Sequence, residues 1–330
     1  MRRPGRAGPP SDHCDGTRFF NPGGDGAGGG LSALLRWRRE RRPAPWPAAL
    51  PSPFADRPPE RSESLRVSFI GHASLLIQLA GLNILVDPVF SQRASPVAFA
   101  GPRRFNPPGV AFDDLPPIDA VLVSHAHYDH LDLPTIRRLR RFDPAFVTAL
   151  GNDAILRRAG AGLRVEAGDW GARVALSPRV EVALTPARHW SARTPFDRNR
   201  ALWCGFFIRA DAGAIYASGD TGYGDGAIFR ALRREHGAPD VAVLPIGAYA
   251  PRWFMQAQHV DPAEAVAIFE ACGAGHALGV HWGTFNLSDE AHDEPPRRLA
   301  EALAARNLAP ERFRALRPGE VFDAGALSIP

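Results

Sequence analysis

The spacing of hydrophobic residues changes several times along the chain, and each change marks a predicted element. Short apolar runs bounded by Gly, Asp or Pro predict strands, because a buried strand needs only about four to eight apolar residues. These runs cover residues 66–70, 74–79, 83–86, 118–123, 145–150, 174–176, 180–184, 202–209, 214–218 and 241–244. Segments with helical spacing cover residues 31–39, 133–142, 152–159, 226–235, 262–272 and 295–306. This order predicts an α/β fold with two sheets in the middle and helices outside both, a four-layer αββα sandwich.

Residues 1–60 differ in composition from the rest of the chain, because they are rich in Pro, Gly and Arg. Such a sequence buries too little apolar surface to offset its chain entropy. We therefore predict a mostly flexible N-terminal segment over residues 1–60 and one globular domain over residues 61–330. Within the segment, residues 17–22 are apolar enough to pack on the domain. Residues 31–39 form a basic amphipathic helix that either docks on the domain or lies on a membrane surface.

Composition limits the classes of partner. The chain has 330 residues, is 45% hydrophobic and carries a formal net charge of +4, which suits a sizeable core and a mildly basic surface. All 39 basic residues are arginine. This bias reflects either a GC-rich genome or a surface suited to phosphate and anionic lipid, since guanidinium binds phosphate in a bidentate fork. The arginines are dispersed and are densest at residues 36–42, so nucleic-acid binding is not predicted.

The cysteines and the apolar runs indicate the compartment. Cys14, Cys204 and Cys272 are odd in number and show no CxxC spacing, which argues against a disulfide framework and a thiolate zinc site. No apolar run reaches the length of a membrane span, and the arginine-rich start lacks the apolar region of a signal peptide. We expect a cytoplasmic protein, and peripheral membrane association stays open.

Three histidines and an aspartate fall within the six residues His125-Ala126-His127-Tyr128-Asp129-His130, directly after the predicted strand at 118–123. A lone histidine is usually a core or surface residue without a metal. Packing three imidazoles together without an ion would leave ring nitrogens in need of other partners, so the cluster favours metal binding. Alternate residues of an extended segment project to the same side. His125 and His127 are therefore predicted to share one ion, while Asp129 and His130 point elsewhere, to a second.

A centre of two ions needs more ligands than one loop supplies, and later strands each end in a candidate. His189, Asp220 and His281 each follow such a strand. Imidazole nitrogen and carboxylate oxygen suit Zn²⁺ best and also admit Mn²⁺ and Fe²⁺. Two ions roughly 3.5–4 Å apart can hold a bridging hydroxide, which makes water a nucleophile at neutral pH. We predict two divalent metal ions as cofactors, with zinc favoured.

The motif His125-x-His127-x-Asp129-His130 after an apolar strand resembles the signature of the metallo-β-lactamase superfamily, whose members mostly hydrolyse esters, amides, thioesters or phosphoesters. The resemblance implies the metallo-β-lactamase fold, which is an αββα sandwich. It also implies a ligand set. The first ion is held by His125, His127 and His189, the second by Asp129, His130 and His281, with Asp220 bridging both. Asp129 is further implied to orient the hydroxide and later to give a proton to the leaving group.

Longer stretches narrow the resemblance. Those that closely resemble the phospholipases D that hydrolyse N-acyl-phosphatidylethanolamine are residues 87–96, 101–105, 115–121, 186–190, 244–249, 258–262 and 281–285. This branch implies hydrolysis of a phosphodiester, with charge in the transition state spread onto both cations. It implies that His259 faces the substrate, where it binds phosphate or protonates the leaving group. His72 and Asp87 are either partners of the ligands or simple turn residues.

The chain differs from that branch in features that bear on the substrate, so the sequence does not determine which substrate is hydrolysed. The N-terminal segment is of a different kind, and no apolar patch in the sequence guarantees acyl-chain binding. Two alternatives remain: hydrolysis of a lactone, a sugar-phosphate lactone or a nucleotide, and a non-enzymatic metal-binding role. An apolar groove above the ions would favour a lipid, and a small basic pocket would favour the other substrates. We expect a phospholipid or small-molecule partner and no nucleic acid, and a homodimer stays open.

Overall fold

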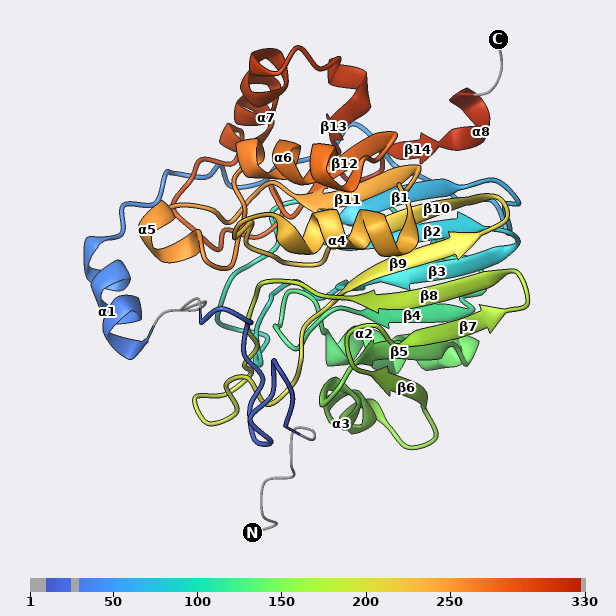
Figure 1. Ribbon diagram of the computed structural model, residues 1–330, viewed down its shortest axis with the longest axis horizontal. Helices are drawn as coiled ribbons and strands as arrows, with labels where there is room; N and C mark the ends of the chain where they lie inside the picture. Colours follow the sequence, from blue (N-terminus) through green and yellow to red (C-terminus); the bar gives the residue numbers. More distant parts are fainter. Residues whose placement is uncertain (1–9, 25–29, 328–330) are drawn as a thin grey trace.

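The computed structural model describes residues 10–24 and 30–327 and arranges them around two stacked β-sheets (Figure 1). The first sheet is seven-stranded, in the order β14-β1-β2-β3-β4-β5-β6. Its strands are β1 (Arg66–Gly71), β2 (Ser74–Leu79), β3 (Leu82–Val86), β4 (Ala120–Val123), β5 (Ala145–Ala149), β6 (Arg164–Gly168) and β14 (Val321–Asp323). The second sheet is also seven-stranded, in the order β13-β12-β11-β10-β9-β8-β7. Its strands are β7 (Arg173–Ser177), β8 (Val180–Thr185), β9 (Gly205–Ala210), β10 (Gly213–Ala217), β11 (Val241–Pro245), β12 (His276–Val280) and β13 (Phe313–Ala315).

Helices cover the outer face of each sheet, as Figure 1 shows for α4 and α6 in front of the second sheet. The helices are α1 (Leu31–Glu40), α2 (Leu133–Leu139), α3 (Asn152–Leu156), α4 (Ala227–His236), α5 (Arg252–Met255), α6 (Pro262–Cys272), α7 (Glu294–Ala305) and α8 (Ala324–Leu327). Apolar residues of α2 and α3 pack with the first sheet, and those of α4, α6 and α7 pack with the second. This is the four-layer αββα sandwich that the sequence predicts.

Neighbouring residues of one strand face opposite layers, which explains why the strands read as unbroken apolar runs. In β4, Leu122 packs between the two sheets, whereas Val121 packs with the helices of the first sheet. In β9, Phe206 faces the space between the sheets, and Phe207 packs with the helices of the second sheet. A strand that is covered on both sides needs no polar face, so its sequence does not alternate.

Two runs of parallel strands bring their carboxyl ends to the edge of the sandwich where the ligands meet. Strands β3 to β6 are parallel in the first sheet, and strands β10 to β13 are parallel in the second. His130, which follows β4, lies 3.2 Å from Asp220, which follows β10. The ends of the two runs therefore meet, and polar side chains that follow these strands share one site.

The structure differs from the sequence-based expectation mainly in short elements. The predicted apolar runs do not include β6, β12, β13 or β14, because β6 is partly exposed, β12 contains His276 and Gly279, and the other two have only three residues each. The helix predicted over 133–142 is α2 followed by a tighter turn at Arg140–Phe142. This turn ends where Asp143 takes a left-handed backbone with a φ of 48°.

Parts of the N-terminal segment pack on the domain. Cys14 and Phe19 are 2% and 1% exposed and belong to the apolar cluster between the sheets. The packing expected for residues 17–22 is thus present at Phe19. Residues 1–9 and 25–29 of the segment that we predict to be mostly flexible lie outside the described residues. The boundary at residue 60 stays a prediction.

The helix α1 docks on the domain through Trp37. The indole ring stacks on Phe254 of α5 with 5.2 Å between ring centres, and its Nε1 donates to Asp289 at 3.1 Å. Of the two roles open for this helix, docking is therefore present, and contact with a membrane surface stays a prediction. Across the described ranges, no helix combines the length and the apolar character that crossing a bilayer requires.

Candidate metal centre

The predicted site residues come together at one edge of the sandwich. They are His125, His127, Asp129 and His130 after β4, His189 after β8, Asp220 after β10, His259 before α6 and His281 after β12. In each group that these residues form, the candidate ligand atoms lie within 4.8 Å of one another. Because the residues come from strands of both sheets, the stacking of the sheets assembles the centre.

Three histidines form one side of the centre. His125 Nε2 lies 2.9 Å from His127 Nδ1, and His127 Nδ1 lies 3.2 Å from His189 Nε2. The two-residue spacing in the loop therefore brings His125 and His127 to a common point, as the sequence predicts. His189 completes this trio from the second sheet.

Asp129, His130 and His281 form the other side. His130 Nε2 and His281 Nε2 lie 3.3 Å apart. Asp129 Oδ2 lies 3.5 Å from His130 Nε2 and 3.4 Å from His281 Nε2. His130 is only three residues from His127 but turns away from it, so one loop serves both sides.

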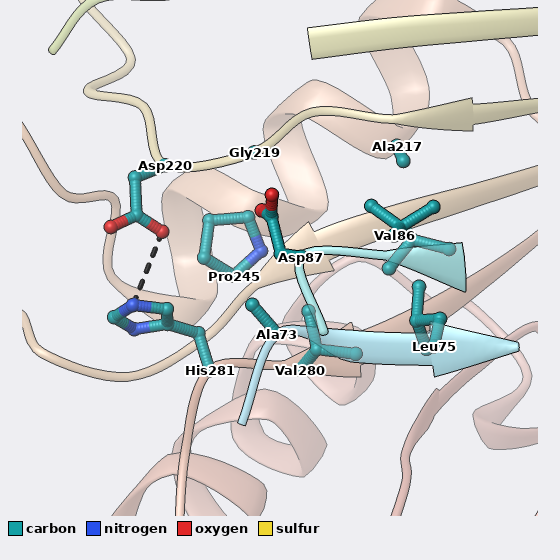
Figure 2. A pocket seen from close by; sticks show the side chains of 11 residues that line it. Ala73, Leu75, Val86, Asp87, Ala217, Gly219, Asp220, Pro245, Val280 and His281 are labelled. Carbon is teal, nitrogen blue, oxygen red and sulfur yellow. Dashed lines mark ion pairs between the residues drawn. The ribbon is translucent and has the colours of Figure 1, made fainter. Parts of the chain in front are cut away.

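Asp220 stands between the two trios. Its Oδ1 lies 3.2 Å from His281 Nε2, the pair joined by the dashed line in Figure 2. Its Oδ2 lies 3.2 Å from His130 Nε2, 3.7 Å from His189 Nε2 and 3.9 Å from His125 Nε2. A single buried carboxylate therefore faces ligand atoms of both trios.

The spacing of these atoms fits divalent cations. Zinc bonds to nitrogen and oxygen are about 2.0–2.2 Å long, so tetrahedral ligand atoms lie about 3.3–3.6 Å apart. The approaches of 3.2 Å between His127 and His189 and 3.3 Å between His130 and His281 are of this size. A direct imidazole pair satisfies the lone pair of only one ring, whereas a shared cation binds both lone pairs. The residues present can therefore hold metal.

Asp87 and Ser124 fix the rings of the ligand loop from behind. His130 Nδ1 lies 2.7 Å from Asp87 Oδ2, and this carboxylate also accepts from the Ser124 backbone N–H at 2.7 Å and hydroxyl at 2.6 Å. Since the Ser124 hydroxyl donates to Asp87, it accepts from His125 Nδ1 at 2.9 Å. With their Nδ1 atoms occupied as donors, His130 and His125 turn their Nε2 atoms toward the centre, so Nε2 is the atom that would bind a cation.

Two further contacts orient the remaining groups. His189 Nδ1 donates to the Gln258 backbone carbonyl at 3.0 Å, which leaves His189 Nε2 for the centre. His72 Nε2 lies 2.9 Å from Asp129 Oδ2. Both His72 and Asp87 thus contact predicted ligands, which favours the supporting role over that of simple turn residues.

The carboxylates control the protonation of the rings near them. Burial would raise the pKa of Asp220, but the charges of His130 and His281 hold it well below its usual range. Burial would lower the pKa of His281, but Asp220 and Asp129 raise it to about 9. The pKa of His130 is raised well above its usual value, because the nearby carboxylates outweigh burial. Protons therefore occupy these two rings until a cation displaces them.

The histidine trio has the opposite character. Burial lowers the pKa of His127 to about 3 and that of His189 to about 4, and it holds the pKa of His125 well below the usual value. These rings are neutral near pH 7. Neutral imidazoles are the form that binds metal, so this side of the centre is ready to coordinate a cation without losing protons.

Left-handed backbone conformations gather at the centre. The φ angles of His72, Asp87 and His281 are 59°, 42° and 65°. Each such residue costs about 1–3 kcal/mol, and residues of this kind collect at functional sites. The backbone N–H of His281 donates to the His72 carbonyl at 2.7 Å, so two of these residues hold each other in place.

Two glycines let the ligand segments approach their neighbours. A Cβ at Gly219 would lie 2.8 Å from the Cys204 carbonyl oxygen and 3.1 Å from Ser124 Cβ. A Cβ at Gly247 would collide with the His281 carbonyl oxygen. Asp220 and His281 can therefore reach the centre only because no side chain stands at these two positions.

His259 lies over both trios. Its ring centre is 5.1 Å from that of His189 and 5.4 Å from that of His281, and its Nδ1 is 3.9 Å from Asp220 Oδ2. This buried Nδ1 has no hydrogen-bond partner among the described residues. Burial holds the pKa of His259 well below its usual value, against the opposing charge of Asp220. The ring is thus a neutral group with a free polar atom.

The centre opens on the side of His127 and Asp129, because these two are partly exposed while the other predicted ligands are buried. The Trp190 ring packs on His127 with 4.6 Å between centres, and the Arg198 guanidinium lies 4.6 Å from the Trp190 ring. The cavity in Figure 2 lies between the sheets behind the centre, where Asp220 and His281 line it together with Asp87 and Val86. Its volume of about 20 Å³ has room for one water and no substrate.

Sequence reasoning misses three groups that act on the ligands: the Ser124 hydroxyl, the Gln258 carbonyl and the Asn21 side chain, which bonds to the backbone of His189. Ser124 stands directly before the motif, so its position was a usable signal. The Gln258 group belongs to the backbone, which every residue has, and Asn21 comes from the N-terminal segment. Neither carries a signal in the sequence.

Comparison with known proteins agrees with this geometry. Residues 82–282 match the family described as a beta-lactamase superfamily domain. The chain is 36% identical over 275 residues to N-acyl-phosphatidylethanolamine-hydrolyzing phospholipase D 1 of Caenorhabditis elegans, covering 80% of this chain and 77% of that one. It is 35% identical over 228 residues to the mitochondrial N-acyl-phosphatidylethanolamine-hydrolyzing phospholipase D of Saccharomyces cerevisiae, covering 68% of this chain and 48% of that one.

A solved structure shows the same fold. Igni18, a metallo hydrolase from the archaeon Ignicoccus hospitalis, superposes with a TM-score of 0.59 and 23% sequence identity, over 78% of this chain and 97% of that one. At this identity the likeness speaks for the fold alone.

Proposed function

The chain belongs to the beta-lactamase superfamily and is a metal-dependent hydrolase of that fold, and from this premise we propose that it is a dinuclear phosphodiesterase of N-acyl-phosphatidylethanolamine-like lipids. The observation that carries the proposal is the position of Asp220 between two trios of ligand atoms. One carboxylate that faces both trios suits a pair of ions that share it. A pair of ions, in turn, suits a phosphodiester, whose two non-bridging oxygens each need a positive partner.

The roles proposed for the ligands follow this division. His125, His127 and His189 would hold one ion, Asp129, His130 and His281 the other, and Asp220 both. When bound, divalent ions lower the pKa of water and stabilise charge that develops on phosphate oxygens. Zinc is the proposed metal, because imidazole and carboxylate at these spacings are its usual ligands.

Asp129 is the residue proposed to move the proton. Its side chain is 13% exposed, on the open side of the centre, while His72 holds its Oδ2 from behind. Burial would raise the pKa of Asp129, but the charge of His130 and the hydrogen bonds that Asp129 accepts hold this pKa well below its usual range. Asp129 therefore starts as a carboxylate. Water forms the new P–O bond as the bond to the leaving alcohol breaks. Asp129 takes the proton from that water and returns it to the leaving oxygen.

His259 is proposed to contact the phosphate. Of the two roles open from the sequence, hydrogen bonding suits the geometry better than protonation of the leaving group. A neutral buried ring is a poor acid, but its unpartnered Nδ1 can carry a hydrogen toward a phosphate oxygen. The contact of Arg252 with the His259 backbone carbonyl, at 2.9 Å, holds this residue in place.

The lipid part of the proposal rests on the relatives named for N-acyl-phosphatidylethanolamine and on the surface near the centre. Phe196 is 83% exposed on a loop that is tied to the ligand loop. Arg193 of that loop donates to the Ala126 and Leu131 carbonyls, both at 2.8 Å, and its guanidinium lies 3.9 Å from the Tyr128 ring. An exposed phenylalanine fixed beside the opening is suited to enter a lipid surface.

A second exposed phenylalanine stands on another loop beside the centre. Phe99 is 83% exposed between β3 and β4, on the loop where Ala94 packs with Tyr128 and Phe285. On α5, Trp253 is 42% exposed, and the Arg36 guanidinium of α1 lies 4.4 Å from its ring. Aromatic rings next to arginine are a common composition of surfaces that meet anionic lipid headgroups. We therefore propose peripheral membrane contact through these exposed aromatic residues.

The test measures metal content and two hydrolytic activities of the purified protein. The substrates are bis-p-nitrophenyl phosphate and N-acyl-phosphatidylethanolamine in detergent micelles. The Asp129→Asn/His130→Ala double variant is the matched control. We expect close to two metal ions per chain, cleavage of both substrates, and no cleavage by the control.

Other results would change the proposal in defined ways. Cleavage of the small diester without the lipid would keep the reaction and reject the substrate. Failure on both substrates, with metal bound, would reject the phosphodiesterase and direct the search to lactones. One ion per chain in the active protein would reject the dinuclear centre.

A further inference from the structure

Asn21 belongs to the N-terminal segment, yet its side chain bonds to both backbone polar groups of His189. Asn21 Nδ2 donates to the His189 carbonyl at 3.0 Å, and the His189 N–H donates to Asn21 Oδ1 at 3.2 Å. The same Oδ1 accepts from Trp203 Nε1 at 3.2 Å. Asn21 is only 4% exposed, so these bonds form away from water. A side chain that pairs with both groups of one residue fixes that residue's backbone.

His189 depends on this support more than an ordinary ligand. It lies on the long connection between β8 and β9, outside any helix or strand. Its ring is fixed at Nδ1 by the Gln258 carbonyl, 3.0 Å away, and is 1% exposed. Without Asn21, the buried N–H and C=O of His189 would lose the partners that they have. Buried backbone groups without partners are unfavourable, so the connection would shift to find others.

The N-terminal strap, residues 10–24, is anchored at two points that precede Asn21. His13 Nε2 lies 2.7 Å from Asp169, and the His13 ring stacks on Trp170 with 4.3 Å between centres. The Phe19 N–H donates to the Asn199 carbonyl at 2.8 Å, on the same connection as His189. The N-terminal strap therefore joins the turn between β6 and β7 to the segment that carries the ligand.

We propose that Asn21 is a positioning residue of the metal centre, and that the N-terminal strap thereby sets how firmly His189 holds its ion. The proposal rests on the proposed function only in taking His189 as a ligand. It adds a component that no motif of the hydrolase domain contains, because the residue comes from a segment that precedes the first strand.

The test compares the Asn21→Ala variant with the wild-type chain, loaded with Co²⁺. Visible absorption of bound Co²⁺ reports the geometry of its ligands, and capture by a chromogenic chelator reports how fast it leaves. We expect a changed absorption spectrum and roughly 10–100-fold weaker retention of part of the metal, the usual range for loss of a group that orients a ligand. Asn21→Asp keeps the shape and the acceptor for the His189 N–H, but it places a carboxylate oxygen against the His189 carbonyl oxygen, where the two acceptors repel each other. It should change the spectrum and the metal retention in the same direction as Asn21→Ala, and it replaces the alanine variant if that variant fails to fold.

The matched control is Asn83→Ala. Asn83 is also a buried asparagine, and its Nδ2 bonds to the Glu60 and Pro117 carbonyls, at 2.9 Å and 2.8 Å. Its loss should lower stability without altering the Co²⁺ spectrum. Equal spectral changes in both alanine variants, or none in Asn21→Ala, would overturn the proposal. Co²⁺ binding without phosphodiester hydrolysis in the wild type would instead reject the proposed function and leave this inference intact.

Discussion

His130 and Asp87 form a buried pair in which imidazole Nδ1 and carboxylate Oδ2 lie 2.7 Å apart and both residues are 1% exposed. Asp87 directly follows β3, and His130 lies in the loop after β4, so the pair links the ends of neighbouring strands of the first sheet. The carboxylate also accepts from Ser124, which in turn contacts His125. One residue behind the centre thus orients a predicted ligand on each side of it.

The Asp87→Asn variant tests this relationship. Asparagine keeps the shape but removes the charge that holds the Nδ1 hydrogen of His130, so metal affinity should fall roughly 10–100-fold. Competition with a fluorescent chelator measures the affinity. Asp211→Asn is the control, because Asp211 lies on the surface and pairs with Arg179 at 3.1 Å. Equal affinities for the Asp87 variant and the wild type would contradict the role given to this carboxylate.

Metal binding should release protons. The pKa of His281 is raised to about 9 and that of His130 lies well above the ordinary 6.5, so both rings carry protons at neutral pH in the chelator-treated protein. A cation must displace these protons. Apparent metal affinity should therefore rise with pH from neutrality through about 9, where His281 loses its proton, and it should stop rising only when His130 has lost its proton as well. Calorimetry in buffers of different ionisation enthalpy counts the protons, and release of none would rule out the predicted protonation.

The His259→Gln variant separates substrate contact from metal binding. Glutamine still offers a polar group but cannot place it where Nδ1 stands, over Asp220. Loss of a hydrogen bond to phosphate should lower kcat for bis-p-nitrophenyl phosphate by about 10²–10³-fold, the effect of removing one donor from a developing charge. Metal content should stay at the wild-type level. Loss of metal together with activity would instead make His259 a ligand.

The Gly247→Ala variant tests how closely the backbone must pass behind His281. The new methyl group would collide with the carbonyl oxygen of His281, the predicted ligand that directly follows β12. Such overpacking should lower the free energy of unfolding by about 1–3 kcal/mol and weaken metal retention. Denaturant unfolding and metal analysis measure both. At Gly30 an added methyl group meets nothing closer than 3.8 Å, so Gly30→Ala should match the wild type.

Exposed phenylalanines should matter more for lipid than for a soluble substrate. In the Phe99→Ser/Phe196→Ser variant, sedimentation with vesicles of anionic phospholipid should fall. The ratio of lipid to small-diester hydrolysis should fall at least about tenfold, since each buried phenyl ring contributes about 1.5–3 kcal/mol. Phe54→Ser is the control, because Phe54 is 44% exposed but lies beside Gly319 near β14. Equal losses in both variants would contradict a lipid-facing surface.

The sequence predicts the sandwich and the position of the centre because both depend on local patterns. Short apolar runs such as that of β4 predict strands, and a histidine or aspartate directly after a strand lies at the edge of a sheet. His189, Asp220 and His281 are found in this way, although they come from different strands. Short strands are missed, since the three residues of β14 leave no room for a pattern.

The support behind the ligands is less predictable for physical reasons. Asn21 bonds to backbone groups of His189, and any ligand in that place would present the same backbone groups. The left-handed φ of 65° at His281 is set by packing against His72 and Gly247, because local preference disfavours it. Such features follow from the approach of distant segments, which a single sequence does not display.

The division of the ligands between two sheets bears on how the protein matures. The loop after β4 carries four of the predicted ligands and leaves the ribosome early, whereas His281 follows β12 and leaves late. An ion captured by the early loop has few ligands and exchanges readily. The full set closes only when the second sheet has docked on the first. Metal capture is therefore expected to be a late step in biogenesis, so that cellular metal supply acts on the finished sandwich and not on the nascent chain.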